Sequence, residues 1–217
     1  VTLPEGLTSR EAAAILLAEP ALSGGLPPKL EEGSLLPETY LFTYGDDRSA
    51  MAKQMQQAMT QLIDRTWEQR SANLPIRTKE QAITLASIVE KETGVASERP
   101  LVASVFINRL NKGMRLQSDP TVVYGIYAQS GVPSKKPITL DDLKRETPYN
   151  TYVIDGLPPT PIANPGKASI EAVLNPPQTD FLYFVATGTG GHRFAKTLDE
   201  HNNNVRQYRE TLAKKQP

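Results

Sequence analysis

The segment ITLASIVEKETGVASERP, residues 83–100, predicts a helix with an apolar stripe, and two acidic side chains, Glu90 and Glu92, lie near the end of that helix. On a helical wheel of about 100° per residue, Glu92 falls at roughly 340° from Leu85, inside the apolar stripe. Glu90 falls at roughly 140°, at the edge of the stripe. The pattern therefore predicts that Glu92 lies on the buried face of a helix and that Glu90 flanks this face.

A carboxyl group on a buried helix face can serve as an acid near neutral pH. A carboxylate is costly to desolvate unless it is paired or protonated, so burial raises the pKa of a glutamate. A raised pKa is what a general acid needs to carry its proton at neutrality. The alternative is that the helix ends at Thr93 and Gly94, and that Glu92 points into water.

The elements that must position these glutamates are mostly helices. Capping boxes are predicted at Thr8 with Glu11 and at Thr78 with Gln81, because a hydroxyl is followed three residues later by Glu or Gln. Apolar periodicity predicts helices over Thr8–Leu17, Ser49–Arg70, from Thr78 through the two glutamates, Ser97–Lys112 and Leu198–Lys215. The β-branched and aromatic run FLYFVAT, Phe181–Thr187, predicts a strand, and a second strand is expected after the turn GTGGHRF.

The segments between these elements are richer in Gly, Pro and Asn. We expect MRLQSDPTVVYGI (114–126) to be short and extended, YAQSGVPSKKP (127–137) to be a loop, and LDDLKRE (140–146) to be a helical turn. The fold class that follows is α+β, a helical core with a small antiparallel sheet.

Composition excludes several classes of function. The chain has 24 basic and 24 acidic residues, which gives no electrostatic reason to expect nucleic acid as a partner. It has no cysteine and only two histidines, His192 and His201, so thiolate chemistry is excluded and a metal site is not expected. No apolar run approaches the roughly 18 residues of a membrane span. Because the chain opens at Val1 without Met, we expect it to be a soluble part of a longer protein.

Four blocks of the sequence closely resemble the signature of the endolytic murein transglycosylases, the YceG-like or MltG family. They are EEGSLLPETY (31–40), LASIVEKETGVASERPLVASVFINRLNKGMRLQSDPTVVYGI (85–126), YNTYVIDGLPPTPIANPG (149–166) and FLYFVATGTGGHRFAKTLDEHN (181–202). The blocks appear in the family's order with similar spacing. The resemblance implies a lysozyme-like helical core, with residues 1–47 as an N-terminal helix and connecting segment and 48–217 as the catalytic domain.

The resemblance also implies a reaction. Family members cleave the β-1,4 bond between MurNAc and GlcNAc in nascent peptidoglycan, and the family glutamate matches Glu92. The protonated acid would donate to the glycosidic oxygen and then accept the proton of the MurNAc C6 hydroxyl, which closes a 1,6-anhydro ring. This chemistry needs no metal and no organic cofactor.

Polar residues in the matched blocks are candidates for binding the sugars. Tyrosine rings and amide or hydroxyl groups suit sugar rings and acetamido groups. The candidates are Glu38, Gln117, Ser118, Asp119, Tyr149, Asn150, Thr151 and Tyr152. For each residue of the 149–152 block, a structural turn is an equal alternative, and Asp119 before a proline is also typical of a cap. His192 follows two glycines, where a tight turn is the simpler interpretation.

The resemblance further implies a location and partners. Full-length members are held in the inner membrane by one N-terminal helix, with the catalytic domain on the periplasmic side. Peptidoglycan glycan strands are the expected substrate, and peptidoglycan synthases are expected neighbours.

Two other hypotheses stay open. One is a muramidase-type hydrolase with Asp119 or Glu90 as the second carboxylate. The other is a non-catalytic glycan-binding scaffold.

Overall fold

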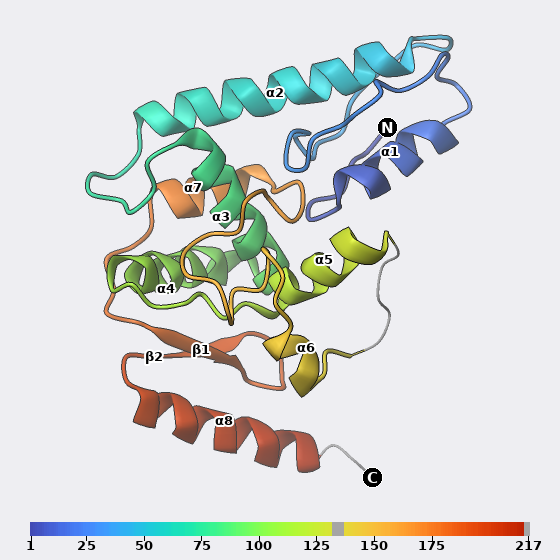
Figure 1. Ribbon diagram of the computed structural model, residues 1–217. Coiled ribbons are helices and arrows are strands. Elements are labelled where there is room, and N and C mark those ends of the chain that lie inside the picture. Colours follow the sequence, from blue (N-terminus) through green and yellow to red (C-terminus); the bar gives the residue numbers. More distant parts are fainter. Residues whose placement is uncertain (132–136, 215–217) are drawn as a thin grey trace.

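The computed structural model describes residues 1–131 and 137–214. Within these ranges, eight α-helices and one short 3-10 helix accompany a two-stranded sheet (Figure 1). The elements are α1 (Ser9–Ala18), α2 (Arg48–Glu68), α3 (Lys79–Glu92), η1 (Ala96–Glu98), α4 (Arg99–Asn111), α5 (Asp119–Ser130), α6 (Leu140–Lys144), α7 (Lys167–Leu174), β1 (Tyr183–Ala186), β2 (His192–Ala195) and α8 (Leu198–Ala213).

Helix α3 is the centre of the main core. It packs against α2, α4, α5 and α7, and its apolar stripe is fully buried at Leu85, Ile88 and Val89. The helix begins after Thr78, whose side chain accepts from the backbone N–H of Gln81. The predicted capping box is only half formed, because the Gln81 side chain accepts from the N–H of Arg77 instead.

The small sheet lies between α4 and α8 (Figure 1). Strands β1 and β2 pair antiparallel with Tyr183 opposite Ala195 and Ala186 opposite His192. Phe184 meets the buried ring of Phe106 on α4 edge-on, with ring centroids 5.8 Å apart. These contacts confirm the α+β class and attach the sheet to the helical core.

The N-terminal segment forms a second apolar cluster with the first half of α2. The cluster includes Leu3, Leu16, Leu35, Met51 and Met55. The capping box of α1 at Thr8 is formed as predicted.

Two side chains attach this segment to the rest of the molecule. Arg48 donates from Nε to the carbonyl of Leu16 at 2.6 Å and from Nη2 to that of Leu22 at 2.8 Å. Asn164 accepts from the N–H of Leu35 at 2.9 Å and donates to the carbonyl of Leu7 at 3.0 Å.

Two helices depart from the sequence prediction. The segment expected to be extended contains α5, which buries Thr121, Val122 and Gly125. Pro120 does not prevent this helix, because it lies in the first turn, where its missing N–H costs no helical bond. Gly131 ends α5 with a left-handed φ of 68°. Helix α7 was not predicted. It has no side-chain cap, and five of its eight residues are buried, so contacts with the core stabilise this helix rather than local sequence signals.

Two other predicted boundaries touch undescribed residues. The loop expected over 127–137 begins with the end of α5, and 132–136 lie outside the described residues. Helix α8 ends at Ala213, and Lys215 also lies outside them.

Candidate active site

Glu92 is the last residue of α3, at the edge of a cavity of 410 Å³. The helix stops there because Thr93 is extended, with φ −137° and ψ 131°. The cavity is bounded by α3, α4, β1, α8 and the loops around residues 116 and 152. Its lining residues are Glu92, Arg109, Leu116, Gln117, Asp119, Tyr152, Phe184, Val185, His201 and Val205.

The Glu92 carboxyl is held by one short hydrogen bond and is largely withdrawn from water. Ser118 donates from Oγ to Glu92 Oε1 at 2.5 Å. Burial raises the pKa of Glu92 to about 7, and the nearby charge of Asp119 adds to this. The Ser118 hydrogen bond and the charge of Arg109 act in the opposite direction. Glu92 can therefore hold a proton at neutral pH and still release it readily.

Ser118 is fixed from behind by buried threonines. Its backbone N–H donates to Thr151 Oγ1 at 2.9 Å, and Thr151 Oγ1 lies 2.8 Å from Thr121 Oγ1. Gln117, the preceding residue, has a left-handed φ of 52°. A non-glycine residue adopts this conformation at a cost of about 1 kcal/mol or more. The surrounding contacts therefore hold the loop in the shape that points Ser118 at Glu92.

Asp119 and Tyr152 form a second polar pair in the cavity. Tyr152 donates from its hydroxyl to Asp119 Oδ1 at 2.6 Å. Burial and the bond to Asp119 raise the pKa of Tyr152 above its usual range, so its proton stays on the hydroxyl. This pair places one fixed carboxylate beside the Glu92 acid.

Arg109 supplies a positive charge at the floor of the cavity. Its Nε donates to the carbonyl of Leu182 at 2.7 Å and its Nη1 to that of Leu116 at 2.8 Å. Its guanidinium carbon lies 5.3 Å from the centroid of the Tyr183 ring. Because carbonyls and a ring hold it, the charge does not pair directly with Glu92.

His201 lines the opposite wall from α8. Its ring stacks on Tyr183 at 5.2 Å between centroids, and its buried Nδ1 has no hydrogen-bond partner among the described residues. Burial and the charge of Arg109 lower its pKa, so the ring is neutral at pH 7. Neither Arg109 nor His201 was singled out for this cavity from the sequence. No local pattern relates these residues to Glu92.

The candidates from the sequence divide into two groups. Gln117, Asp119 and Tyr152 line the cavity with Glu92, and Ser118 contacts the acid itself. The other four candidates neither line the cavity nor form a hydrogen bond to Glu92: Glu38, Tyr149, Asn150 and Thr151.

Each member of the second group has a local partner. Asn150 and Thr151 are fully buried, and Asn150 donates to three carbonyls, the shortest bond being 2.8 Å to Arg145. Tyr149 packs edge-on against Tyr124. Glu38 is exposed, and its side chain accepts from the next backbone N–H.

Two other candidate groups pair outside the cavity. Glu90 lies 3.1 Å from Arg99 and accepts from the N–H of Gly166 at 2.9 Å, with a side chain only 4% exposed. His192 Nδ1 lies 2.7 Å from Glu98. Glu90 therefore belongs to a structural ion pair rather than to the cavity of Glu92.

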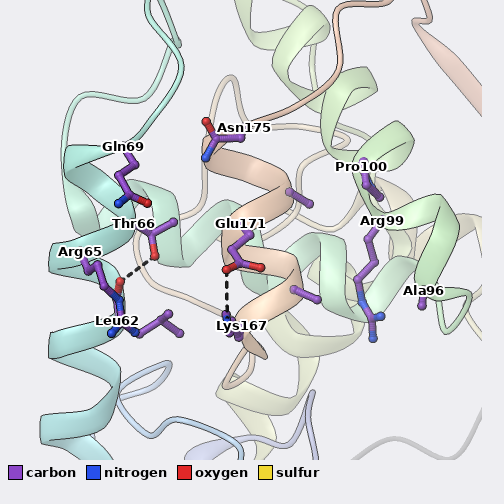
Figure 2. A pocket seen from close by; sticks show the side chains of 12 residues that line it. Leu62, Arg65, Thr66, Gln69, Ala96, Arg99, Pro100, Lys167, Glu171 and Asn175 are labelled. Atoms are coloured by element: carbon purple, nitrogen blue, oxygen red, sulfur yellow. Dashed lines mark hydrogen bonds and ion pairs between the residues drawn. The ribbon is translucent and has the colours of Figure 1, made fainter.

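A larger cavity, of 620 Å³, lies between α2, α7 and the start of α4 (Figure 2). Its only described acidic side chain, Glu171, is paired with Lys167 at 3.6 Å. Within the described part of the chain, no three His, Asp or Glu side chains group closely enough to hold a metal ion. The Glu92 cavity is thus where an acid, a carboxylate and a cation meet.

Comparison with known proteins places this fold in a family. The model of the YceG-like family matches residues 1–207. A crystal structure of a YceG-like protein from Listeria monocytogenes superposes with a TM-score of 0.70 at 33% identity, covering 93% of this chain and 74% of that one. The fold is therefore that of the YceG-like proteins.

The curated relatives are more specific. An endolytic murein transglycosylase of Bacillus subtilis is 40% identical over 182 residues, which are 82% of this chain and 48% of the relative. The enzyme of the same name from Streptococcus pneumoniae is 34% identical over 182 residues and is covered to 32%. The chain thus spans 32% to 48% of the length of these relatives. It belongs to the YceG-like family.

Proposed function

We propose that this chain is the catalytic part of an endolytic murein transglycosylase, a lyase that cuts peptidoglycan glycan strands. The observation that carries the proposal is Glu92, a carboxyl group in a cavity with its pKa raised to about 7. The family membership and the names of the relatives agree with this reaction.

The reaction we propose uses Glu92 twice. Protonated Glu92 donates to the oxygen between MurNAc C1 and GlcNAc, and the C1–O bond breaks as that oxygen takes the proton. The substrate's N-acetyl group stabilises C1. The C6 hydroxyl of the same MurNAc then attacks C1, and its proton passes to the Glu92 carboxylate. The products are a 1,6-anhydroMurNAc end and a free GlcNAc 4-hydroxyl, and no water is consumed.

A pKa near 7 suits both steps. A carboxyl group with an ordinary pKa would have lost its proton before it met the substrate at neutral pH. We propose that Ser118 sets the orientation of the acid, because its hydroxyl is the group that contacts Glu92 directly. Thr151 and Asn150 then act by positioning this loop rather than by touching sugar.

The other polar residues of the cavity are proposed to hold the sugars. Asp119, fixed by Tyr152, can accept from a sugar hydroxyl with its second oxygen. Gln117 is exposed at the rim, where its amide suits an acetamido group. Phe184 and Val185 provide an apolar wall from β1.

Location and partners follow from the substrate. Murein lies outside the cytoplasmic membrane, so we propose that the chain works there. None of the described helices is long and apolar enough to cross a membrane. A membrane anchor elsewhere in a longer protein, and peptidoglycan synthases as neighbours, stay predictions from the family resemblance.

One competing function has a specific observation in its favour. Asp119 lines the same cavity as Glu92, so a hydrolase could use it as the second carboxylate. Glu90 is a weaker candidate for that role, since Arg99 and the Gly166 N–H already occupy its oxygens.

The proposal is tested with Glu92→Gln, which removes the transferable proton and keeps the shape of the side chain. Glu90→Gln is the matched control, two residues away on the same helix. On nascent, uncrosslinked glycan, Glu92→Gln should lose nearly all turnover with its fold intact, and Glu90→Gln should keep substantial activity. If Glu92→Gln keeps its turnover, Glu92 is not the acid. If the wild type itself shows no turnover, a non-catalytic glycan-binding scaffold becomes the better interpretation.

A further inference from the structure

A second cavity adjoins the Glu92 cavity along α5. Its volume is 360 Å³, within the range of about 300–1,000 Å³ that small-molecule sites occupy. Both cavities are lined by Asp119, the first residue of α5. The second cavity, called here the α5 groove, is lined by Thr8, Glu11, Lys91, Asp119, Pro120, Val123, Tyr124, Tyr127 and Ile162.

The walls of the α5 groove are fixed by hydrogen bonds between distant segments. Tyr124 donates from its hydroxyl to Glu32 Oε2 at 3.1 Å, and the other Glu32 oxygen accepts from the N–H of Ser9 on α1 at 2.7 Å. Lys91 donates to the carbonyl of Gly6 at 3.1 Å. Because α1, α3 and α5 are tied together in this way, the groove is a built feature of the fold.

The floor of the groove is apolar and aromatic, and its rim is polar. Tyr124 and Tyr127 meet edge-on with centroids 5.8 Å apart, and Val123 on the same helix is 36% exposed. Thr8, Glu11 and Lys91 stand at the rim. Sugar rings need this combination, since their C–H faces pack on aromatic rings while their hydroxyls bond to polar groups at the edge.

We propose that the α5 groove binds further sugar residues of the glycan strand whose scissile bond lies at Glu92. The inference rests on the function proposed above and names a part of the substrate that the Glu92 cavity does not hold. Asp119 is the shared wall over which the strand passes from one cavity to the other. A strand held in both places is cut away from its ends, which is how an endolytic enzyme acts.

The test compares Tyr127→Ala with Tyr44→Ala, a tyrosine that is 86% exposed and lines neither cavity. Both are made with and without Glu92→Gln. The inert Glu92→Gln forms are titrated calorimetrically with peptide-free strands, from a tetrasaccharide to a dodecasaccharide. The active forms are assayed on the same series.

Affinity should rise with strand length in Glu92→Gln and in its Tyr44→Ala form. Adding Tyr127→Ala should weaken binding of the long strands by about tenfold or more, the effect of removing a central aromatic contact, and spare the shortest strand. Thermal unfolding checks the fold, and Val123→Ala provides a second, milder truncation. An unchanged length dependence in both groove variants overturns the inference.

If the proposed function itself is wrong, the assay of the active forms gives a different result. In that case, the active forms make no anhydro ends from any strand. If wild type makes anhydro ends while the groove variants match it at every length, only the α5 groove proposal fails.

Discussion

Replacing Glu92 by Gln should make the protein more stable at alkaline pH than the wild type. The pKa of Glu92 is raised from 4.5 in the unfolded chain to about 7 in the fold. A raised folded pKa means that the native state favours the protonated acid. This stabilisation is complete below about pH 4.5 and is lost as the pH rises through 7. Glutamine, which does not ionise, loses nothing over the same range.

The size of the effect follows from the two pKa values. One pKa unit corresponds to about 1.4 kcal/mol. Between pH 5 and pH 8, the unfolding free energy of the wild type should therefore fall by about 2.5 kcal/mol relative to that of Glu92→Gln. All other titrating groups are shared, so the difference between the two proteins isolates this one carboxyl.

Urea unfolding followed by circular dichroism at the two pH values measures the difference. Glu210→Gln, at an exposed position on α8, is the control and should follow the wild type at both pH values. The reasoning is refuted if the gap between the wild type and Glu92→Gln is the same at pH 5 and pH 8. In that event the carboxyl is not desolvated in the native state.

Three further predictions concern the rate. The kcat/KM of the wild type should fall as the pH rises through about 7, where Glu92 loses its proton, and a rate that climbs steadily through alkaline pH would contradict this. Ser118→Ala removes a bond that lowers the Glu92 pKa, so the falling limb should move to higher pH; a shift to lower pH is the contrary result. Asp119→Asn removes a charge that raises that pKa and weakens the bond from Tyr152. It should move the limb to lower pH and slow turnover by about 10- to 100-fold, with the product still anhydroMurNAc by mass spectrometry.

Much of the fold was predictable because its signals are local. Three such signals are the capping box at Thr8, the apolar stripe of α3 and the aromatic and β-branched run of β1. The residues that form each signal are near neighbours in the sequence. Helix α5 was mispredicted for a physical reason. Val122, Val123 and Tyr124 favour strands by propensity, but packing of Val122 and its neighbours into the core outweighs this weak preference.

The site was predictable only in part. Periodicity placed Glu92 on the apolar face, and its shifted pKa agrees with that placement. Arg109 and His201 reach the cavity from α4 and α8, far along the chain, so no spacing rule connects them to Glu92. The 149–152 block mixes exposed and buried polar groups. The sequence alone does not separate Tyr152, in the cavity, from Asn150, which bonds to carbonyls behind it.

The most direct test of the central claim is digestion of nascent glycan in oxygen-18 water, with the new ends weighed by mass spectrometry. If the substrate's own C6 hydroxyl attacks C1, every new MurNAc end is a 1,6-anhydro end without label, one water lighter than a reducing end. Reducing MurNAc ends that carry oxygen-18 would mean that water attacks C1. That result would make the chain a hydrolase and contradict the mechanism built on Glu92 alone.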